Sequence, residues 1–487
     1  MFKQSFIVPI HKGDSHAEAS NYRPVALTSH LCKIFEKILR KHMVHYLESK
    51  QCLNPRQHGF RTGRSCISQL LEHFEKLITE VCNGNNADVV YIDFSKAFDK
   101  LDFSILMKKL KRFGITGKVG KWIMSFLMGR KQCVIVNGNK STPTLVLSGV
   151  PQGSVLGPLL FILFMTDIDK DVQYSFSSSY ADDTRIMNKI ANIEDIYHLQ
   201  NDMNAMYRWS ETNNMVLNDL KFELLQYGRD NDLKLLGSYK TPAGLKIDSK
   251  SEIKDLGVVM SSDLTFSKHI NSVVSSVKDL IAWTLQTFYS RSQICMMTIW
   301  QSLILPRLDY GSQLWNPIRK ADINALELLQ RNFVKRIYGL GYLTYWEQLI
   351  ELGLYSLQRR RERYLIIYLW KIFENFVPNP KPNQIYVKYD NHRLGRMCFI
   401  PTLRNGIYKE LQMTSFSYNA AKLFNCLPKY IRDLTGCSKE KFKHTLDYYL
   451  KSIPDEPQIP GYTDCRRTDT NSVLDMNCFS NYIMTEH

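Results

Sequence analysis

The stretch Tyr180-Ala181-Asp182-Asp183 decides the fold, because an apolar segment that ends at Asp93 lies upstream of it. That segment, residues 88–94, has the continuous apolar pattern of a buried strand. Neighbouring residues of a strand point to opposite faces, so Asp182 and Asp183 can serve one site only if a turn intervenes. Ser177 to Ser179 and Thr184 leave room for that turn. The sequence therefore predicts a tight hairpin whose carboxylates meet Asp93 from another strand.

Carboxylates brought together from separated strands are suited to paired Mg²⁺ ions, which need only a few oxygen ligands besides substrate phosphates. This is the arrangement of a polymerase palm. Taken alone, Asp93 reads better as the N-cap of a following helix, and the downstream hairpin reverses that preference. Asp99 and Asp102 read as surface or capping groups.

Between the two acidic segments lies Gly149-Val150-Pro151-Gln152-Gly153, whose glycines indicate a close approach of the main chain to something else. The amide of Gln152 could contact an incoming nucleotide. Phe98 could stack beneath a sugar and clash with a 2′-hydroxyl, which would select deoxynucleotides. A simple strand-to-helix turn and a core aromatic residue are the plain alternatives.

Basic residues form a second group of candidates. Lys12 and Arg23 could clamp a triphosphate, and Lys221 could protonate or screen pyrophosphate. Arg61 and Arg64 could hold the template backbone, and the run Arg359 to Arg363 could hold duplex backbone. A solvated surface cation is the alternative for each.

Composition narrows the class of protein. The 487 residues carry a net charge of +16, and the pI is about 9.2. Charge alone does not distinguish a polyanionic partner such as nucleic acid from a solvated basic surface. In combination with the motifs, it favours nucleic acid. Eleven scattered cysteines without a Cys-x-x-Cys pair indicate a reducing compartment and no zinc knuckle. The start of the chain shows no secretory signal, and the longest apolar run, residues 155–165, is too short for a membrane span. We expect a soluble, intracellular protein.

The pattern along the chain predicts several domains. Strands at 6–10 and 23–27 and helices at 31–43 and 65–81 make up residues 1–86. Residues 87–265 alternate strands and helices in the manner of an α+β sheet, including strands at 216–228 and 256–260. Residues 266–377 are helical, and prolines at 378, 380 and 382 mark a linker to a smaller region, 378–453. Residues 454–487 are expected to form a disordered tail.

These motifs, in this order, resemble the reverse transcriptase of non-LTR (LINE-type) retrotransposons, close to the jockey group. The resemblance covers residues 1 to about 450. The segments that carry it are Pro9 to Lys12 with Asn21 to Pro24, His58 to Arg61, Tyr91 to Asp99, Ser148 to Leu160, Tyr180 to Thr184, Asn218 to Lys221, Leu256 to Val258, and Leu305 to Gly311 with Trp315.

The resemblance implies a right-hand fold, with fingers at 1–86, palm at 87–265 and thumb at 266–377. It implies RNA-templated DNA synthesis from a DNA primer with dNTPs, using two Mg²⁺ ions, for which Mn²⁺ could substitute. Asp93, Asp182 and Asp183 match the family's metal triad, Phe98 its sugar gate, Gln152 its nucleotide contact, and Lys12 and Arg23 its triphosphate contacts. Leu256 and Gly257 match its primer-grip turn. Work in a cytoplasmic ribonucleoprotein and in the nucleus would follow.

Against the family's pattern, we expect the chain to begin inside the fingers without the endonuclease, and we find no ribonuclease H signature or Cys/His knuckle after the thumb. Two rival hypotheses therefore remain. One is a truncated, inactive copy that only binds nucleic acid, which the intact triad argues against. The other is an RNA-dependent RNA polymerase, which Phe98 argues against. The oligomeric state stays open.

Overall fold

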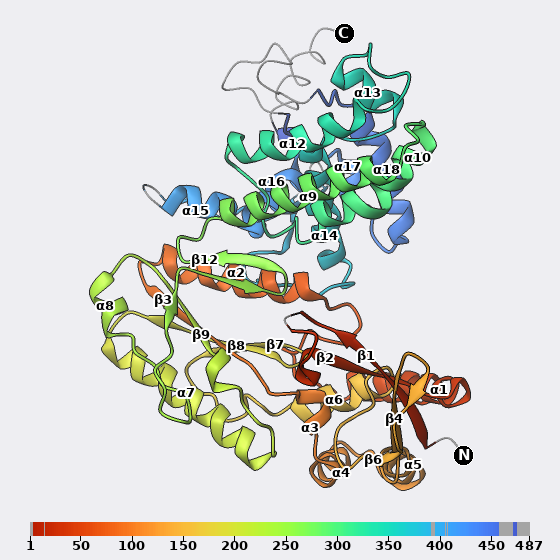
Figure 1. Cartoon of the computed structure of the whole chain (residues 1–487). Coiled ribbons are helices and arrows are strands. Elements are labelled where there is room, and N and C mark those ends of the chain that lie inside the picture. Colours follow the sequence, from red (N-terminus) through yellow and green to blue (C-terminus); the bar gives the residue numbers. More distant parts are fainter. Residues whose placement is uncertain are drawn as a thin grey trace. The chain divides into compact units, whose positions relative to one another are not determined.

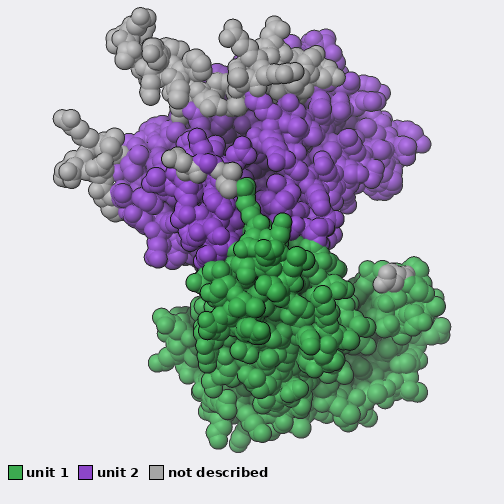
Figure 2. Space-filling model, turned by 90° about the vertical axis from the view of Figure 1, so that its left-hand side faces the viewer, with its two compact units in different colours: residues 1–69, 86–250 green, residues 70–85, 251–487 purple. Residues whose placement is uncertain are grey.

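The structure, a computed structural model, describes residues 3–13, 15–390, 395–404, 406, 408–456 and 471–474. The chain divides into two compact units (Figure 2). Unit 1 contains residues 1–69 and 86–250, and unit 2 contains residues 70–85 and 251–487.

Unit 1 contains two sheets and the helices that accompany them (Figure 1). Its strands are β1 (Gln4–His11), β2 (Tyr22–Leu27), β3 (Asn86–Ile92), β4 (Lys131–Val136), β5 (Asn139–Lys140), β6 (Thr144–Leu145), β7 (Phe176–Tyr180), β8 (Asp183–Ile190), β9 (Glu223–Tyr227) and β10 (Ser249–Lys250). Its helices are η1 (Ala19–Asn21), α1 (His30–Ser49), the start of α2 (Cys66–Cys82), α3 (Ala97–Lys100), α4 (Phe103–Arg112), α5 (Gly117–Leu127), α6 (Gly157–Met165), α7 (Ile193–Thr212), η2 (Asp219–Lys221) and α8 (Asn231–Leu236).

The larger sheet has the strand order β10-β9-β3-β8-β7. Strand β3 lies at its centre and pairs antiparallel with both β8 and β9. Every residue of β3 except Tyr91 is buried, as the continuous apolar run of the sequence predicts. The second sheet pairs β1 antiparallel with β2 and parallel with β4. Asn137 and Gly138, both with positive φ, form the predicted turn between β4 and β5.

Helix α6 lies within the core that the larger sheet shares with α4, α5 and α7. All of its residues from Gly157 to Met165 are buried except Pro158, because the segment is apolar on every side. Glu36 of α1 provides a hydrogen-bond acceptor for main-chain N–H groups at the start of this helix, and its side chain is fully buried. One carboxylate oxygen of Glu36 accepts hydrogen bonds from the main-chain N–H groups of Val155 (2.7 Å) and Leu156 (2.9 Å). A side chain 119 residues away in sequence thus caps α6.

Helix α1 is present, but the N-terminal part of its apolar stripe does not lie in the core. Leu31, Ile34 and Ile38 are 66%, 56% and 55% exposed, and the buried residues of α1 are Glu36, Met43 and Leu47. Periodicity detected the helix correctly and did not reveal which face the unit covers, because both faces of α1 carry apolar residues.

Unit 2 is mainly helical, as predicted for the chain from residue 266 onward. Its helices are the rest of α2, α9 (Ser267–Thr287), α10 (Gln293–Ile299), the π-helix η3 (Trp300–Ile304), α11 (Leu305–Asp309), α12 (Lys320–Val334), α13 (Tyr345–Glu351), α14 (Leu357–Phe373), α15 (Tyr408–Thr414), α16 (Phe416–Asn425), α17 (Lys429–Arg432) and α18 (Lys439–Lys451). Its strands form the hairpins β11 (Glu252–Asp255) with β12 (Val258–Ser261) and β13 (Val387–Asp390) with β14 (Gly395–Cys398).

Two predicted strands are corrected by the structure. The span 216–228 contains a strand only at β9, because Asp219–Lys221 forms a 3₁₀ turn. The span 256–260 begins with a turn, since Leu256 and Gly257 both have positive φ and connect β11 to β12. Alternation of apolar residues did not distinguish a continuous strand from a strand interrupted by a turn.

Part of the expected tail is packed rather than frayed. Asn471 and Val473 are 2% and 0% exposed. The main-chain N–H of Val473 donates to Glu362, and the carboxylate of Asp455 accepts hydrogen bonds from Ser356. Residues 454–456 and 471–474 thus belong to unit 2, and the rest of the span 454–487 lies outside the described residues.

The predicted domain bounds at residues 86, 265, 377 and 453 stay predictions, because the grouping by contact distinguishes only the two units. Within the described ranges, no helix combines the length and the apolar character that crossing a membrane requires.

Candidate active site

The predicted hairpin is formed by β7 and β8, with Tyr180 paired to Asp183 across a turn of two residues, Ala181 and Asp182. Ala181 has a φ of 58°, in the left-handed region, which closes the turn. Asp182 is half-buried and Asp183 is exposed. The prediction of a tight hairpin at these residues is confirmed.

Asp93 directly follows β3, and the β3–β8 register pairs Ile92 with Thr184. That register continues to Asp93 beside Asp183, so the two acidic segments lie on neighbouring strands. Asp93 does not cap a helix: the residue before α3 is Lys96, which has left-handed backbone geometry and makes no side-chain cap. The capping interpretation is therefore wrong for Asp93. It is right for Asp102, whose carboxylate accepts from the N–H groups of Ser104 and Ile105 at the start of α4.

The three carboxylates influence one another electrostatically. Although the residue Asp183 is exposed as a whole, the surrounding protein removes much of the water from its carboxyl group, and this effect, followed by the charges of Asp182 and Asp93, raises the pKa of Asp183 to about 6. The pKa of Asp182 is raised by burial and by Asp93, and Arg23 and Lys12 oppose that shift. Repelling carboxylates of this kind are stabilised by a cation.

The donor set suits a hard cation such as Mg²⁺, because all three groups are carboxylates. Within the part of the chain that the structure describes, no three His, Cys, Asp or Glu side chains are already disposed around a common point as metal ligands. The chemistry of the donors and their place at the ends of neighbouring strands are what point to a metal site here. The residues present fit a divalent metal ion.

Two residues of the 218–221 segment contact Asp93. The ammonium of Lys221 lies 3.7 Å from Asp93 Oδ2, and its side chain is 68% exposed. The side-chain amide of Asn218 donates to the same oxygen at 3.2 Å, and its main-chain N–H donates to the Asp93 carbonyl at 2.9 Å. Asn218 thus orients Asp93, while Lys221 remains largely in solvent.

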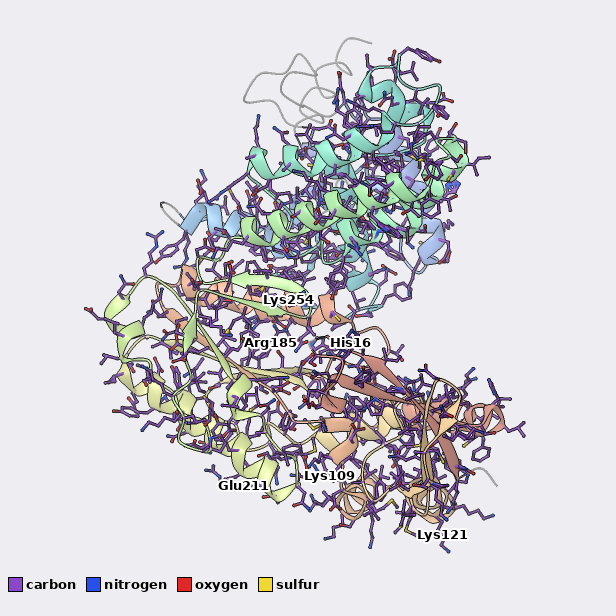
Figure 3. The ribbon with its side chains drawn as sticks, viewed as in Figure 1. His16, Lys109, Lys121, Arg185, Glu211 and Lys254 are labelled. Carbon is purple, nitrogen blue, oxygen red and sulfur yellow. The ribbon has the colours of Figure 1, made fainter. Side chains whose placement is uncertain are left out.

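Lys12 and Arg23 are both exposed, and they flank the β1–β2 hairpin. The N–H of Lys12 donates to the carbonyl of Asn21 at 2.9 Å. His16, labelled in Figure 3, lies in the connection between the two strands and stacks on His11 at 3.8 Å between ring centroids. The positive charges of Arg23 and Lys12 act to lower the pKa of Asp182, against the larger effect of burial.

Phe98 is half-buried and stacks on Phe161 of α6 with 4.1 Å between ring centroids. The amide nitrogen of Gln152 donates to Asp99 Oδ1 at 2.9 Å, so Asp99 has a partner role that the sequence did not indicate. Any nucleotide contact by Gln152 would compete with this bond.

The glycines beside Gln152 make the predicted close approach. A Cβ at Gly149 would lie 2.6 Å from the carbonyl oxygen of Asp99, and one at Gly153 would lie 2.7 Å from that of Ala26. Both glycines have positive φ. Main chain of this segment is thereby held against both the α3 region and β2.

The predicted template contacts at Arg61 and Arg64 are less simple. The side chain of Arg61 is only 8% exposed, and its guanidinium pairs with Glu48 at 2.7 Å and donates to the carbonyl of Asn54 at 2.6 Å. Arg64 is half-buried. Arg61 has an evident structural role, and template binding by both residues stays a prediction.

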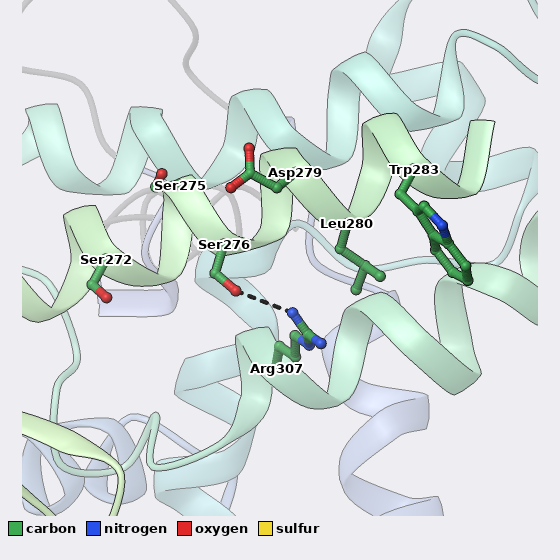
Figure 4. Close-up of a pocket in the computed structure, with 7 residues that line it drawn as sticks. All are labelled: Ser272, Ser275, Ser276, Asp279, Leu280, Trp283 and Arg307. Atoms are coloured by element: carbon green, nitrogen blue, oxygen red, sulfur yellow. Dashed lines mark hydrogen bonds between the residues drawn. The ribbon is translucent and has the colours of Figure 1, made fainter. Parts of the chain in front are cut away.

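In unit 2, the predicted primer-grip residues Leu256 and Gly257 form the β11–β12 turn. The hydroxyl of Tyr310 donates to the carbonyl of Leu256 at 2.6 Å. A shallow hollow on α9 of the same unit is lined by the residues shown in Figure 4, where Arg307 donates to Ser276 at 3.0 Å.

The arginine run of α14 does not form the predicted basic surface. Arg359 and Arg361 are buried, at 0% and 3% exposure. Arg360 pairs with Asp309 at 2.8 Å, and Arg363 pairs with Asp447. The sequence predicts a basic surface here because the acidic partners, Asp309 and Asp447, are distant along the chain and give no local signal.

Two residues near the acidic cluster were missed as site residues. Asn218 belongs to the segment Asn218 to Lys221, which carries part of the family resemblance, so the sequence could have indicated it as a site residue. Gln57, whose amide hydrogen-bonds to Ala181, gives no local signal because its partner lies 124 residues away.

Comparison with known proteins agrees with this geometry. The chain is 27% identical over 363 residues to the probable RNA-directed DNA polymerase from transposon X-element of Drosophila melanogaster, covering 70% of this chain and 38% of that protein. It is 28% identical over 352 residues to the RNA-directed DNA polymerase from mobile element jockey of the same organism, covering 69% and 38%. The chain thus spans well under half of these relatives.

Among solved structures, telomerase from Candida tropicalis in complex with a telomeric RNA fragment aligns with a TM-score of 0.40 at 10% identity, covering 92% of this chain and 64% of that one. The family of reverse transcriptases (RNA-dependent DNA polymerases) matches residues 10–260, more than half of the 487 residues. The predicted α+β class with a helical C-terminal region is confirmed by the strands and helices of the structure, and the chain belongs to the reverse transcriptase (RNA-dependent DNA polymerase) family.

Proposed function

We propose that the chain is the RNA-directed DNA polymerase of a non-LTR retrotransposon, and that it extends a DNA 3′ end on an RNA template with dNTPs. The observation that carries the proposal is the acidic cluster on neighbouring strands. Asp182 and Asp183 have raised pKa values, Asp93 contributes to both shifts, and the cations Arg23 and Lys12 act on Asp182. A negative cluster facing positive groups can accept a metal-bound triphosphate between them.

Asp93, Asp182 and Asp183 would hold two Mg²⁺ ions, for which Mn²⁺ could substitute. Bound there, such ions supply activation of the attacking 3′-oxygen and charge neutralisation at the leaving pyrophosphate. The chain's own residues orient the groups: Asn218 fixes Asp93 by two hydrogen bonds, and the Ala181 turn presents Asp182.

The other candidate residues have separate roles in binding the nucleotide and releasing pyrophosphate. Lys12 and Arg23 bind the triphosphate, and Lys221, 3.7 Å from Asp93, screens or protonates pyrophosphate as it leaves. Phe98, supported by its stack on Phe161, excludes the 2′-hydroxyl. Gln152 contacts the nucleotide after releasing Asp99.

Template and primer would be held outside the cluster. Arg61 and Arg64 contact the template, and the turn at Leu256 and Gly257 contacts the primer. An enzyme that copies RNA onto a DNA end would work in a cytoplasmic ribonucleoprotein and in the nucleus.

Primer extension on an RNA template with dNTPs and Mg²⁺ tests the proposal. Asp182→Asn removes one carboxylate charge, and the loss of several kcal/mol of charge stabilisation is expected to slow extension by about 10³-fold. Asp171→Asn is the matched control, because Asp171 is an exposed aspartate of the same unit. If the unmutated chain binds RNA and adds no nucleotide, the proposal is wrong and a binding-only protein takes its place.

A further inference from the structure

Gln57 touches the turn that carries Asp182, although it lies in another segment of unit 1. We propose that Gln57 is a positioning residue: its side-chain amide holds the main chain of Ala181 and thereby fixes where the carboxylates of Asp182 and Asp183 lie. The role of those carboxylates as metal ligands rests on the proposed function.

The contact uses both ends of the Gln57 amide. Oε1 accepts a hydrogen bond from the N–H of Ala181 at 2.9 Å, and Nε2 donates to the carbonyl of Ala181 at 3.1 Å. Gln57 is 4% exposed and Ala181 is 5% exposed. Because water does not reach these main-chain groups, an unpaired N–H or C=O here would destabilise the turn.

Ala181 needs such support because its conformation is unfavourable. A non-glycine residue in the left-handed region, as at φ 58°, is strained because its Cβ lies too close to the following carbonyl oxygen. The conformation persists only where surrounding contacts fix it, and strain of this kind concentrates at functional sites. The Gln57 amide forms hydrogen bonds with both main-chain polar groups of the strained residue. It therefore stabilises the two-residue turn, Ala181 and Asp182, from which the Asp182 side chain extends.

The segment that carries Gln57 is itself fixed. Gln57 forms a parallel bridge with Ser179, and the N–H of His58 donates to the carbonyl of Ser179 at 2.8 Å. Oε1 of Gln57 also accepts from the N–H of Gly59 at 2.8 Å. A Cβ at Gly59 would lie 2.4 Å from the nitrogen of Ala181, so only glycine permits this approach.

Substitutions at Gln57 distinguish the effect of its hydrogen bonds from the effect of the size of its side chain. Gln57→Met is similar in length but can neither donate to nor accept from Ala181. Gln57→Glu keeps the acceptor for the N–H groups of Ala181 and Gly59, loses the donor to the Ala181 carbonyl, and brings a negative charge toward the acidic cluster. Gln51→Glu is the matched control, because Gln51 is exposed in the same unit.

Two measurements on the full chain test the role. Single-turnover primer extension is expected to lose about 10²-fold in rate for Gln57→Met, with the KM for dNTP changed by no more than about threefold, because a ligand displaced by about 1 Å impairs chemistry more than binding. Binding of Mn²⁺, counted from the electron paramagnetic resonance signal of the free ion, is expected to weaken roughly tenfold. Gln51→Glu is expected to match the unmutated chain in both.

The two measurements also separate this inference from the proposed function. An unmutated chain that extends no primer refutes the proposed function, while weaker Mn²⁺ binding by the Gln57 variants would still support positioning. Equal Mn²⁺ binding and equal extension rates in Gln57→Met and the unmutated chain overturn the inference. If Gln57→Met loses its thermal unfolding transition, Gln57→Glu, which retains two of the three hydrogen bonds, takes its place with the same criteria.

Discussion

At the scale of single residues, Asp88 of β3 couples stability to pH. Its side chain is 1% exposed, and its Oδ2 accepts from the hydroxyl of Tyr239 at 2.6 Å and from Gln226 at 3.3 Å. Burial raises the pKa of Asp88 to about 6, and the bonds from Tyr239 and Gln226 oppose the shift. The folded state therefore keeps this proton at pH values where the unfolded chain has released it.

The sign of the effect follows directly. As pH rises from about 4 to about 6, Asp88 removes about 2–3 kcal/mol from the free energy of unfolding, and above that range its contribution is constant. Asp88→Asn, which cannot ionise, is expected to abolish this part of the slope. Denaturant unfolding of both proteins across pH 4 to 7 measures the difference, and parallel curves would contradict the prediction.

At the scale of elements, the β11–β12 turn depends on left-handed geometry. Gly257 has a φ of 85°, and a Cβ there would lie 3.2 Å from the ring of Tyr310. Gly257→Ala is therefore expected to lower the free energy of unfolding by about 1–2 kcal/mol. Gly341→Ala in the same unit is the control, because Gly341 lacks positive φ and has open space around it. Thermal melting that ranks the two variants equally would show that the turn is not strained.

At the scale of the whole molecule, the net charge of +16 predicts strong salt dependence of nucleic-acid binding. If about six phosphates are neutralised, affinity for an RNA–DNA primer–template is expected to fall about 10³-fold between roughly 50 and 200 mM salt. Fluorescence anisotropy with a labelled duplex measures the slope.

The arginine run offers a control for the source of that charge. Arg363 is 14% exposed and pairs with Asp447 inside unit 2. Arg363→Gln is therefore expected to leave the salt slope unchanged while lowering the melting temperature. A slope reduced by about one unit in this variant would mean that Arg363 contacts phosphate.

Much of the candidate site was predictable because the relevant signals are local. The buried strand before Asp93, the hairpin at Tyr180 to Asp183 and the close approach of Gly149 follow from strand periodicity and glycine geometry, which depend on neighbouring residues alone. The exposed stripe of α1, which includes Leu31 and Ile38, was not predictable, because periodicity does not report which face a tertiary fold covers.

The sequence by itself determined the class of the protein and pointed to Asp93, Asp182 and Asp183 as candidate site residues, because motif order and residue chemistry are written along the chain. The tertiary structure alone decided which polar groups are partners. Gln57 meets Ala181 across 124 residues, Glu36 caps α6 across 119, and Arg363 meets Asp447 across 84. Such contacts depend on long-range packing. A local sequence pattern does not show which distant residue will form a hydrogen bond with a given buried polar group.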